Sequence, residues 1–253
     1  YLQKKKVSFE SVTAKSLNVR MFRHIRKRMD EANERLAKER GEAPDAEGMG
    51  RRFSHVMAIA PNASSSIIMG NTSPSVEPWR ANAYRQDTLS GAYLNKNKFL
   101  DALIKEKCQE DTKEAAINGS GAKLDYDKIW REIIASEGSI QQLKGVLTDD
   151  EKDIYKTSME IDQRWVIEHA ADRQKFVDQA QSINVFFRPD TNIKYLHAVH
   201  FLAWKSGLKT MYYCRSEKIG KADKVSRQIE RHIIKEINLQ DIAQGEACIA
   251  CEG

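Results

Sequence analysis

Two cysteines near the end of the chain, Cys248 and Cys251, have the CxxC spacing of a redox pair or of half a zinc site. Zinc would need two further ligands, but the chain has no second CxxC, and the nearest histidine in sequence is His232, sixteen residues earlier. A terminal dithiol that is oxidised and re-reduced by thiol–disulfide exchange is therefore the favoured interpretation. Zinc binding and an inert pair are the alternatives.

A turn rich in small polar residues could bind an anion. An apolar run ends there, and the turn contains Pro61, Asn62, Ala63, Ser64 and Ser65. If a helix begins in this turn, its free N–H groups and positive dipole end favour phosphate, and the serine hydroxyls add donors. Arg80 could add a bidentate contact to the same phosphate. The alternative is a serine that only caps the helix and needs no ligand.

Adjacent tyrosines, Tyr212 and Tyr213, stand at the carboxyl end of an apolar run. In a strand their side chains would face opposite sides, so one would lie in the core while the other lines a cavity. Adjacent aromatic residues usually serve packing, and the pair taken alone indicates nothing more. The histidines show no ligand-like grouping beyond His197 and His200 on one helix, and no metal site is predicted.

The elements that must position these residues alternate between helix and strand. The sequence predicts helices over about 14–40, in most of 97–180 (one of them over about 149–179), and over about 15 residues after 190. It predicts strands over 53–60, 182–187 and 208–214, and extended loops with short elements over 72–98. Strand, helix and strand with apolar strands indicate parallel pairing in an α/β layer or barrel.

Composition indicates an ordinary globular protein in a reducing, cytoplasmic setting. The chain has 253 residues, of which 41% are hydrophobic and 30% charged, and only four are cysteines. No apolar run approaches the roughly 20 residues of a membrane-spanning helix. Residues 1–52 carry a balance of +6 within a net charge of +5, but these charges alternate with apolar residues at helical spacing. They indicate the solvent-exposed face of an amphipathic helix rather than a surface that binds nucleic acid.

The order of these features resembles the large, catalytic subunit of class I ribonucleotide reductases. The segments that carry the resemblance are Ala58–Ile68, Glu77-Pro78, Asp178–Asn184, Leu208–Tyr213 and the terminal CxxC. The resemblance implies an α/β fold, namely the C-terminal part of a ten-stranded α/β barrel with helical additions and a flexible C-terminal tail. Residues 1–52 would be a helical lead-in, 53–215 the closing part of the barrel with a helical insertion at about 97–180, and 216–253 the tail.

The resemblance also implies roles for individual residues. The loop Pro61–Ser65 would hold the substrate diphosphate, although Ala63 stands where some relatives have glutamate. Arg80 aligns with a phosphate-contacting arginine. Tyr212 and Tyr213 would relay a radical from a partner subunit to an active-site cysteine. Cys248 and Cys251 would reduce the active-site disulfide after each turnover and be reset by thioredoxin or glutaredoxin.

The resemblance implies partners as well. The radical-bearing cysteine and the two cysteines that form a disulfide would lie in the preceding part of the large subunit, and the chain begins at Tyr1 rather than at methionine. We therefore expect a fragment, a cleaved product or one part of a divided polypeptide, which binds no cofactor itself. It would act with the N-terminal portion and a small subunit that carries a dimetal radical cofactor, and would reduce ribonucleoside diphosphates for DNA replication. No nucleic-acid or membrane partner is expected. The alternatives are a non-catalytic nucleotide-binding or regulatory remnant of the barrel and a zinc-dependent nucleic-acid binder.

Overall fold

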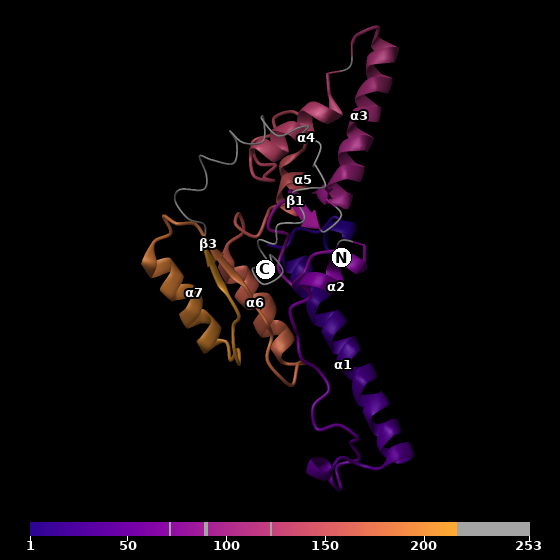
Figure 1. Cartoon of the computed structure of the whole chain (residues 1–253), viewed down its shortest axis with the longest axis vertical. Helices are drawn as coiled ribbons and strands as arrows, with labels where there is room; N and C mark the ends of the chain where they lie inside the picture. The colour runs from indigo at the N-terminus through magenta and orange to yellow at the C-terminus, as the bar shows by residue number, and fades with distance from the viewer. Residues whose placement is uncertain (71, 89–90, 122, 217–253) are drawn as a thin grey trace, which may run out of the picture.

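The computed structural model describes residues 1–70, 72–88, 91–121 and 123–216. Helices dominate these residues, and the strands are short (Figure 1). The helices are α1 (Val12–Arg40), α2 (Ala63–Ile68), α3 (Lys98–Asn118), α4 (Tyr126–Ala135), α5 (Asp149–Ile154), α6 (Gln163–Gln174) and α7 (Ile193–Lys205), with 3-10 turns at Gln3–Lys5 and Pro44–Ala46. The strands are β1 (Ala83–Thr88), β2 (Gly91–Lys96), β3 (Val185–Phe187) and β4 (Cys214–Ser216).

Helix α1 confirms the first predicted helix. Its first turn is capped by Ser11, whose hydroxyl accepts the amide of Ala14 at 3.1 Å. It ends at Gly41, whose φ of +83° lies in the left-handed region that favours glycine. One face of the helix packs on α6, where the side-chain amide of Asn18 donates to the carbonyl of His169 at 2.9 Å.

Three extended segments run parallel to one another, which confirms the α/β interpretation. Ile59 pairs with Gln181 in an isolated parallel bridge, and β3 pairs in parallel with β4. The amide of Ser182 donates to the carbonyl of Ile59 at 2.8 Å, whereas the amide of Val185 donates to the carbonyl of Tyr213 at 2.9 Å. Even- and odd-numbered residues of an extended strand direct their bonds to opposite edges, so the segment 181–187 lies between the other two.

The predicted strands are longer than the observed ones. Of 53–60 only Ile59 forms a bridge, 182–187 shortens to β3, and the strand predicted over 208–214 begins only at Cys214. Extended backbone becomes a strand only where a neighbour satisfies its N–H and C=O groups, and here partners exist over short stretches. Within the described ranges these segments form an open arrangement, since three of them cannot close a barrel.

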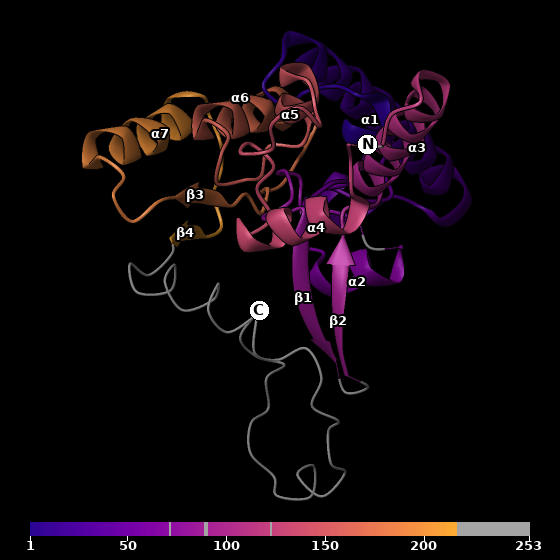
Figure 2. The ribbon, with the colours of Figure 1, turned by 90° about the horizontal axis from the view of Figure 1, so that it is seen from above.

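A hairpin and a small helical unit separate the first segment from the second. Residues 83–96, expected as extended loops with short elements, form the antiparallel pair β1–β2, which projects from the body of the molecule (Figure 2). Helices α3 and α4 pack together with residues 140–147 around their own apolar cluster. Leu100, Ile104 and Ile133 of that cluster are fully buried.

The single helix predicted over 149–179 is wrong, because the chain breaks between α5 and α6. The amide of buried Ser158 donates to the carbonyl of Trp79 at 2.8 Å, a tertiary bond that takes the place of a helical one. Asp162 then starts α6 by accepting the amide of Arg164 at 3.0 Å.

Helices α6 and α7 cover the parallel segments. The cluster between them contains Ile167 of α6, Val185 and Phe187 of β3, and Val199 and Ala203 of α7. The predicted helix after residue 190 is thus confirmed as α7, with its apolar face on β3. This packing fixes the central segment, so it also fixes the two segments that bond to its edges.

Candidate functional site

The polar turn after Ile59 leads directly into α2, as the sequence predicted. Asn62 occupies the N-cap position, but its side chain accepts no backbone amide of the helix. The first amide with an intrahelical acceptor belongs to Ser66 and donates to the carbonyl of Asn62 at 2.9 Å. The preceding N–H groups at 63–65 therefore have no partner within the helix, and their residues are exposed. The turn is open to an anion, and no serine caps it.

Hydrogen bonds within the loop and to the neighbouring part of the chain fix the conformation of the loop. The amide of Asn62 donates to the carbonyl of Pro74 at 3.1 Å, and the hydroxyl of Ser65 donates to the side-chain oxygen of Asn62 at 3.3 Å. The side-chain amide of Asn62 donates in turn to the carbonyl of Ala60 at 3.1 Å. Asn62 thus shapes the loop, which leaves the hydroxyl of Ser64 and the backbone amides as the groups turned outward.

Arg80, the other predicted phosphate ligand, is exposed. Its neighbour Trp79 is buried, and the Trp79 ring lies 6.1 Å from that of Tyr84. Trp79 is therefore a core residue. Arg80 follows it on the surface of the chain.

Tyr212 and Tyr213 lie against each other, with ring centroids 4.0 Å apart. Both are about half-exposed, at 45% and 47%. The expectation that one ring would lie in the core is wrong, because the pair precedes β4 and does not follow the alternation of a regular strand. The backbone is nevertheless fixed, since the amide of Tyr212 donates to the carbonyl of Ile183 at 2.8 Å. The rings are thus in close, tilted contact, with an interplanar angle of 53°, and accessible.

A cation accompanies the tyrosine pair. The guanidinium of Arg215 lies 4.9 Å from the ring centroid of Tyr213, within cation–π range. A hydrogen bond to the phenol of Tyr213 raises the pKa of Tyr212, and the charge of Arg215 opposes this rise. The phenol of Tyr212, like an ordinary phenol, is thus protonated at neutral pH, so its oxidation must also release a proton. No sequence pattern marked Arg215 beyond its position two residues after the pair.

A buried polar group links the Glu77-Pro78 motif to the central segment. The carboxylate of Glu77, 4% exposed, accepts the backbone amide of Asn184 at 2.7 Å. Nearby Arg173 is also buried and donates to the side-chain oxygens of Gln181 and Asn18. Burial lowers the pKa of Arg173 to about 10, and the charge of Glu77 opposes this shift. Sequence reasoning noted the motif but assigned Glu77 no contact.

The remaining predicted site residues, Cys248 and Cys251, lie outside the described residues. Within the described ranges Cys108 and Cys214 are free thiols, and burial raises the pKa of both. In that same part of the chain, no three His, Cys, Asp or Glu side chains converge as a metal site would require. No helix there is long and apolar enough to cross a bilayer.

Similarity to known proteins is extensive. The chain is 51% identical over 245 residues to the ribonucleoside-diphosphate reductase large subunit of Invertebrate iridescent virus 6, covering 96% of this chain and 24% of the relative. It is 48% identical to the corresponding subunit of Invertebrate iridescent virus 3, covering 89% of this chain and 34% of that relative. The chain thus spans about a quarter to a third of the length of these curated relatives.

Solved structures and protein families agree with these relatives. The fold matches an Actinobacillus ureae class Id ribonucleotide reductase alpha subunit with a TM-score of 0.73 and 38% identity, over 86% of this chain and 37% of that one. Residues 44–214 match the family described as ribonucleotide reductase, barrel domain. That range contains the open loop at 61–65, Glu77 and both tyrosines. The chain belongs to the ribonucleotide reductase large-subunit family, of whose barrel domain it carries a part.

Proposed function

We propose that this chain is the C-terminal portion of a ribonucleoside-diphosphate reductase large subunit and supplies part of the site that reduces ribonucleotides to deoxyribonucleotides. The observation that carries the proposal is the parallel arrangement of three segments. One of them leads into the open loop at 61–65, and another holds the two tyrosines whose rings contact each other. In this proposal residues 53–215 form the closing part of a ten-stranded barrel, 97–180 are a helical insertion, and 1–52 are the lead-in.

The loop would bind the substrate diphosphate through its backbone. The amides at 63–65 lack intrahelical acceptors, and the hydroxyl of Ser64 supplies a further donor, whereas Ser65 would contribute its backbone amide. Ala63 has no side-chain donor, so at this position the contact would come from the main chain alone. Arg80 would add a charged contact from the segment that follows.

Tyr212 and Tyr213 would relay a radical between a small subunit and the active-site cysteine. When one phenol is a phenoxyl radical, it gains one electron and one proton from its neighbour, and the neighbour becomes the radical. Ring centroids 4.0 Å apart place the two phenols close enough for this exchange. A phenylalanine has no such proton to give, so either Tyr→Phe change would interrupt the relay.

Cys248 and Cys251 would return the active site to its reduced state. Their two thiols would exchange with the active-site disulfide, which releases two active-site thiols and leaves a disulfide in the tail. Thioredoxin or glutaredoxin would then reduce that disulfide. The proposed partners are therefore the N-terminal portion of the large subunit, a small subunit with a dimetal radical cofactor, and a dithiol reductant.

The rival proposal is a non-catalytic remnant of the barrel that binds nucleotide or regulates a partner. The adjacent, half-exposed tyrosines favour the reductase, because a pure binding module has no use for two phenols in contact with each other. Both proposals include nucleotide binding at the loop, so binding alone does not separate them.

Reconstitution separates the two proposals. Ribonucleotide reduction is measured for this chain alone and in a mixture with the N-terminal portion and a small subunit. We expect activity only in the mixture, its loss in Tyr212→Phe and Tyr213→Phe with nucleotide binding intact, and loss of thioredoxin-driven but not small-dithiol-driven turnover in Cys248→Ser. An inactive mixture that is shown to assemble would favour the remnant.

A further inference from the structure

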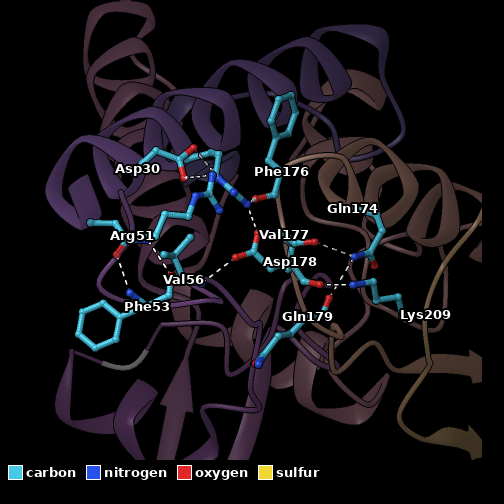
Figure 3. Close-up of polar contacts among 12 residues, drawn as sticks. Asp30, Arg51, Phe53, Val56, Gln174, Phe176, Val177, Asp178, Gln179 and Lys209 are labelled. Atoms are coloured by element: carbon cyan, nitrogen blue, oxygen red, sulfur yellow. Dashed lines mark hydrogen bonds and ion pairs between the residues drawn. The ribbon is translucent and has the colours of Figure 1, made fainter. Parts of the chain in front are cut away.

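The starts of all three parallel segments meet at one residue, Asp178 (Figure 3). Its carboxylate accepts the backbone amide of Val56 at 2.6 Å, three residues before the bridge at Ile59. Its own backbone leads into the central segment. Its carbonyl accepts the ammonium group of Lys209, which stands three residues before Tyr212. One residue therefore contacts the segments that lead to the loop and to the tyrosines.

Helix α1 supplies the opposing charge. The guanidinium of Arg26 pairs with the carboxylate of Asp178 and donates to the carbonyl of Phe176 at 3.3 Å. Asp30, one turn further along α1, accepts the Nε of Arg26 at 2.7 Å and lies 3.7 Å from the guanidinium of Arg51. The side chain of Asp178 is only 12% exposed, so solvent screens these contacts less than those of a surface pair. We call Arg26, Asp178 and Lys209 the segment clasp.

The register of the first segment depends on few other bonds. Between residues 57–59 and 179–182 the backbone bonds are Ile59 to Ala180 at 3.2 Å, Ser182 to Ile59 at 2.8 Å and Gln179 to Met57 at 3.1 Å. A slip by one residue would move the loop by about 3.3 Å along the strand and turn each side chain to the other face. A site for phosphate tolerates only about 0.5 Å of such error.

We propose that the segment clasp is a positioning device that fixes the register of the loop-bearing and tyrosine-bearing segments against the central one, with Asp178 as its positioning residue. Asp178 touches neither the loop nor the tyrosines. It acts through the backbone at 56–59 and 209–212. The consequence for catalysis rests on the proposed function, whereas the consequence for register does not.

Hydrogen exchange in the complete large subunit that carries this sequence tests the register directly. Asp178→Ala removes the acceptor of the Val56 amide and the partner of Arg26. We expect the amides of Ile59 and Ser182 to exchange about tenfold faster or more, with no change at Ile104 in the separate helical cluster. Unchanged exchange at Ile59 and Ser182 overturns the proposal.

If amide hydrogen exchange rises throughout the subunit in Asp178→Ala, the milder variant Asp178→Asn provides the test. Its side-chain amide oxygen can still accept the backbone amide of Val56, whereas the negative charge is gone. Asp178→Asn must then raise exchange at Ile59 and Ser182 above that at Ile104, and equal rises overturn the proposal. Arg26→Gln must show the same pattern. Arg28→Gln is the matched control, since Arg28 pairs only with exposed Glu31 on the same helix.

Kinetics test the consequence for the site. Asp178→Asn and Arg26→Gln should each lower kcat/KM for a nucleoside diphosphate by about 10- to 100-fold, with a higher KM, and the double variant should be no worse than Asp178→Asn alone. If the fold-loss of kcat/KM in the double variant equals the product of the two single fold-losses, Arg26 and Asp178 act independently. That result overturns the proposal that they act as one clasp. If the wild-type subunit does not reduce ribonucleotides, the proposed function fails, and the exchange measurement still judges the clasp.

Discussion

Substitution of Glu77 should lower the free energy of unfolding more than most substitutions, because its carboxylate interacts with two buried groups. Its carboxylate accepts the amide of Asn184 at 2.7 Å, and its charge offsets that of buried Arg173. Glu77→Ala leaves a buried N–H without an acceptor, which costs about 1–3 kcal/mol. It also removes the negative charge that offsets the buried guanidinium of Arg173, and because the two groups, both among the described residues, form no direct ion pair, this loss should cost only about 1–2 kcal/mol.

The two contributions together should cost about 2–4 kcal/mol for Glu77→Ala. Glu77→Gln keeps an acceptor for Asn184 and loses only the charge, so it should cost about 1–2 kcal/mol. Thermal unfolding measures both, because about 1 kcal/mol corresponds to roughly 2–4 °C in Tm for a chain of this size. The geometry therefore predicts that Tm falls in the order wild type, Glu77→Gln, Glu77→Ala.

A surface glutamate provides the control. Glu31 pairs with Arg28 at 2.7 Å on the exposed side of α1, and Glu31→Ala should change stability by less than about 0.5 kcal/mol. Glu77→Ala within that same margin of wild type would refute the reasoning. Equal losses in Glu77→Ala and Glu77→Gln would show instead that the charge alone matters and the bond to Asn184 does not.

Three further predictions concern the tyrosine pair, a buried histidine and the core. Arg215→Met should raise the pKa of Tyr212 further, since the cation opposes the rise; an unchanged tyrosinate absorbance titration contradicts this. Burial lowers the pKa of His169 below 6.5, so its stabilisation is fully present above 6.5 and is lost as pH falls through the lowered folded value. Urea midpoints should therefore fall below about pH 6.5 in wild type but less in His169→Gln; parallel curves would exclude this role. Ile167→Ala should cost about 2–5 kcal/mol in urea unfolding, because Ile167 is fully buried between α6 and β3; a loss below about 1 kcal/mol would mean the site collapses around the cavity.

The sequence predicted the features that local patterns determine. The extent of α1 follows from Ser11 and Gly41 at its ends, and α7 from the spacing of apolar residues around Val199. The loop after Ile59 was predicted from a change in composition alone. Capping and helical periodicity act over a few residues, so one sequence suffices to find them.

Features that depend on distant residues could not be predicted. The break between α5 and α6 is made by a bond from Ser158 to Trp79, and no local signal marks it. The pairing of Glu77 with Asn184 joins residues 107 apart in sequence, and that of Arg26 with Asp178 joins residues 152 apart. For Asp178 the only signal was its place at the start of the segment 178–184 that carries the family resemblance, four residues before the predicted strand.

The direction of the tyrosine side chains shows the same limit. Strand alternation predicted opposite faces, but β4 begins only at Cys214, so Tyr212 and Tyr213 precede the regular strand and share one side. The regular ladder begins where Val185 pairs with Cys214, although the amide of Tyr212 already bonds to Ile183. The close contact of the two phenols thus depends on irregular backbone before β4, which the alternation of a regular strand does not describe.

The surface around the loop connects this fold to the proposed role in a larger barrel. Ile68 and Met69 at the end of α2 are 86% and 74% exposed, beside the open amides at 63–65. Large apolar side chains next to an anion-accepting loop are costly in water but favourable where another element covers them. In the proposed reductase the preceding part of the large subunit would cover them and enclose the diphosphate. The clasp at Asp178 would then matter most, because it fixes the far end of the segment that presents this loop to its partner.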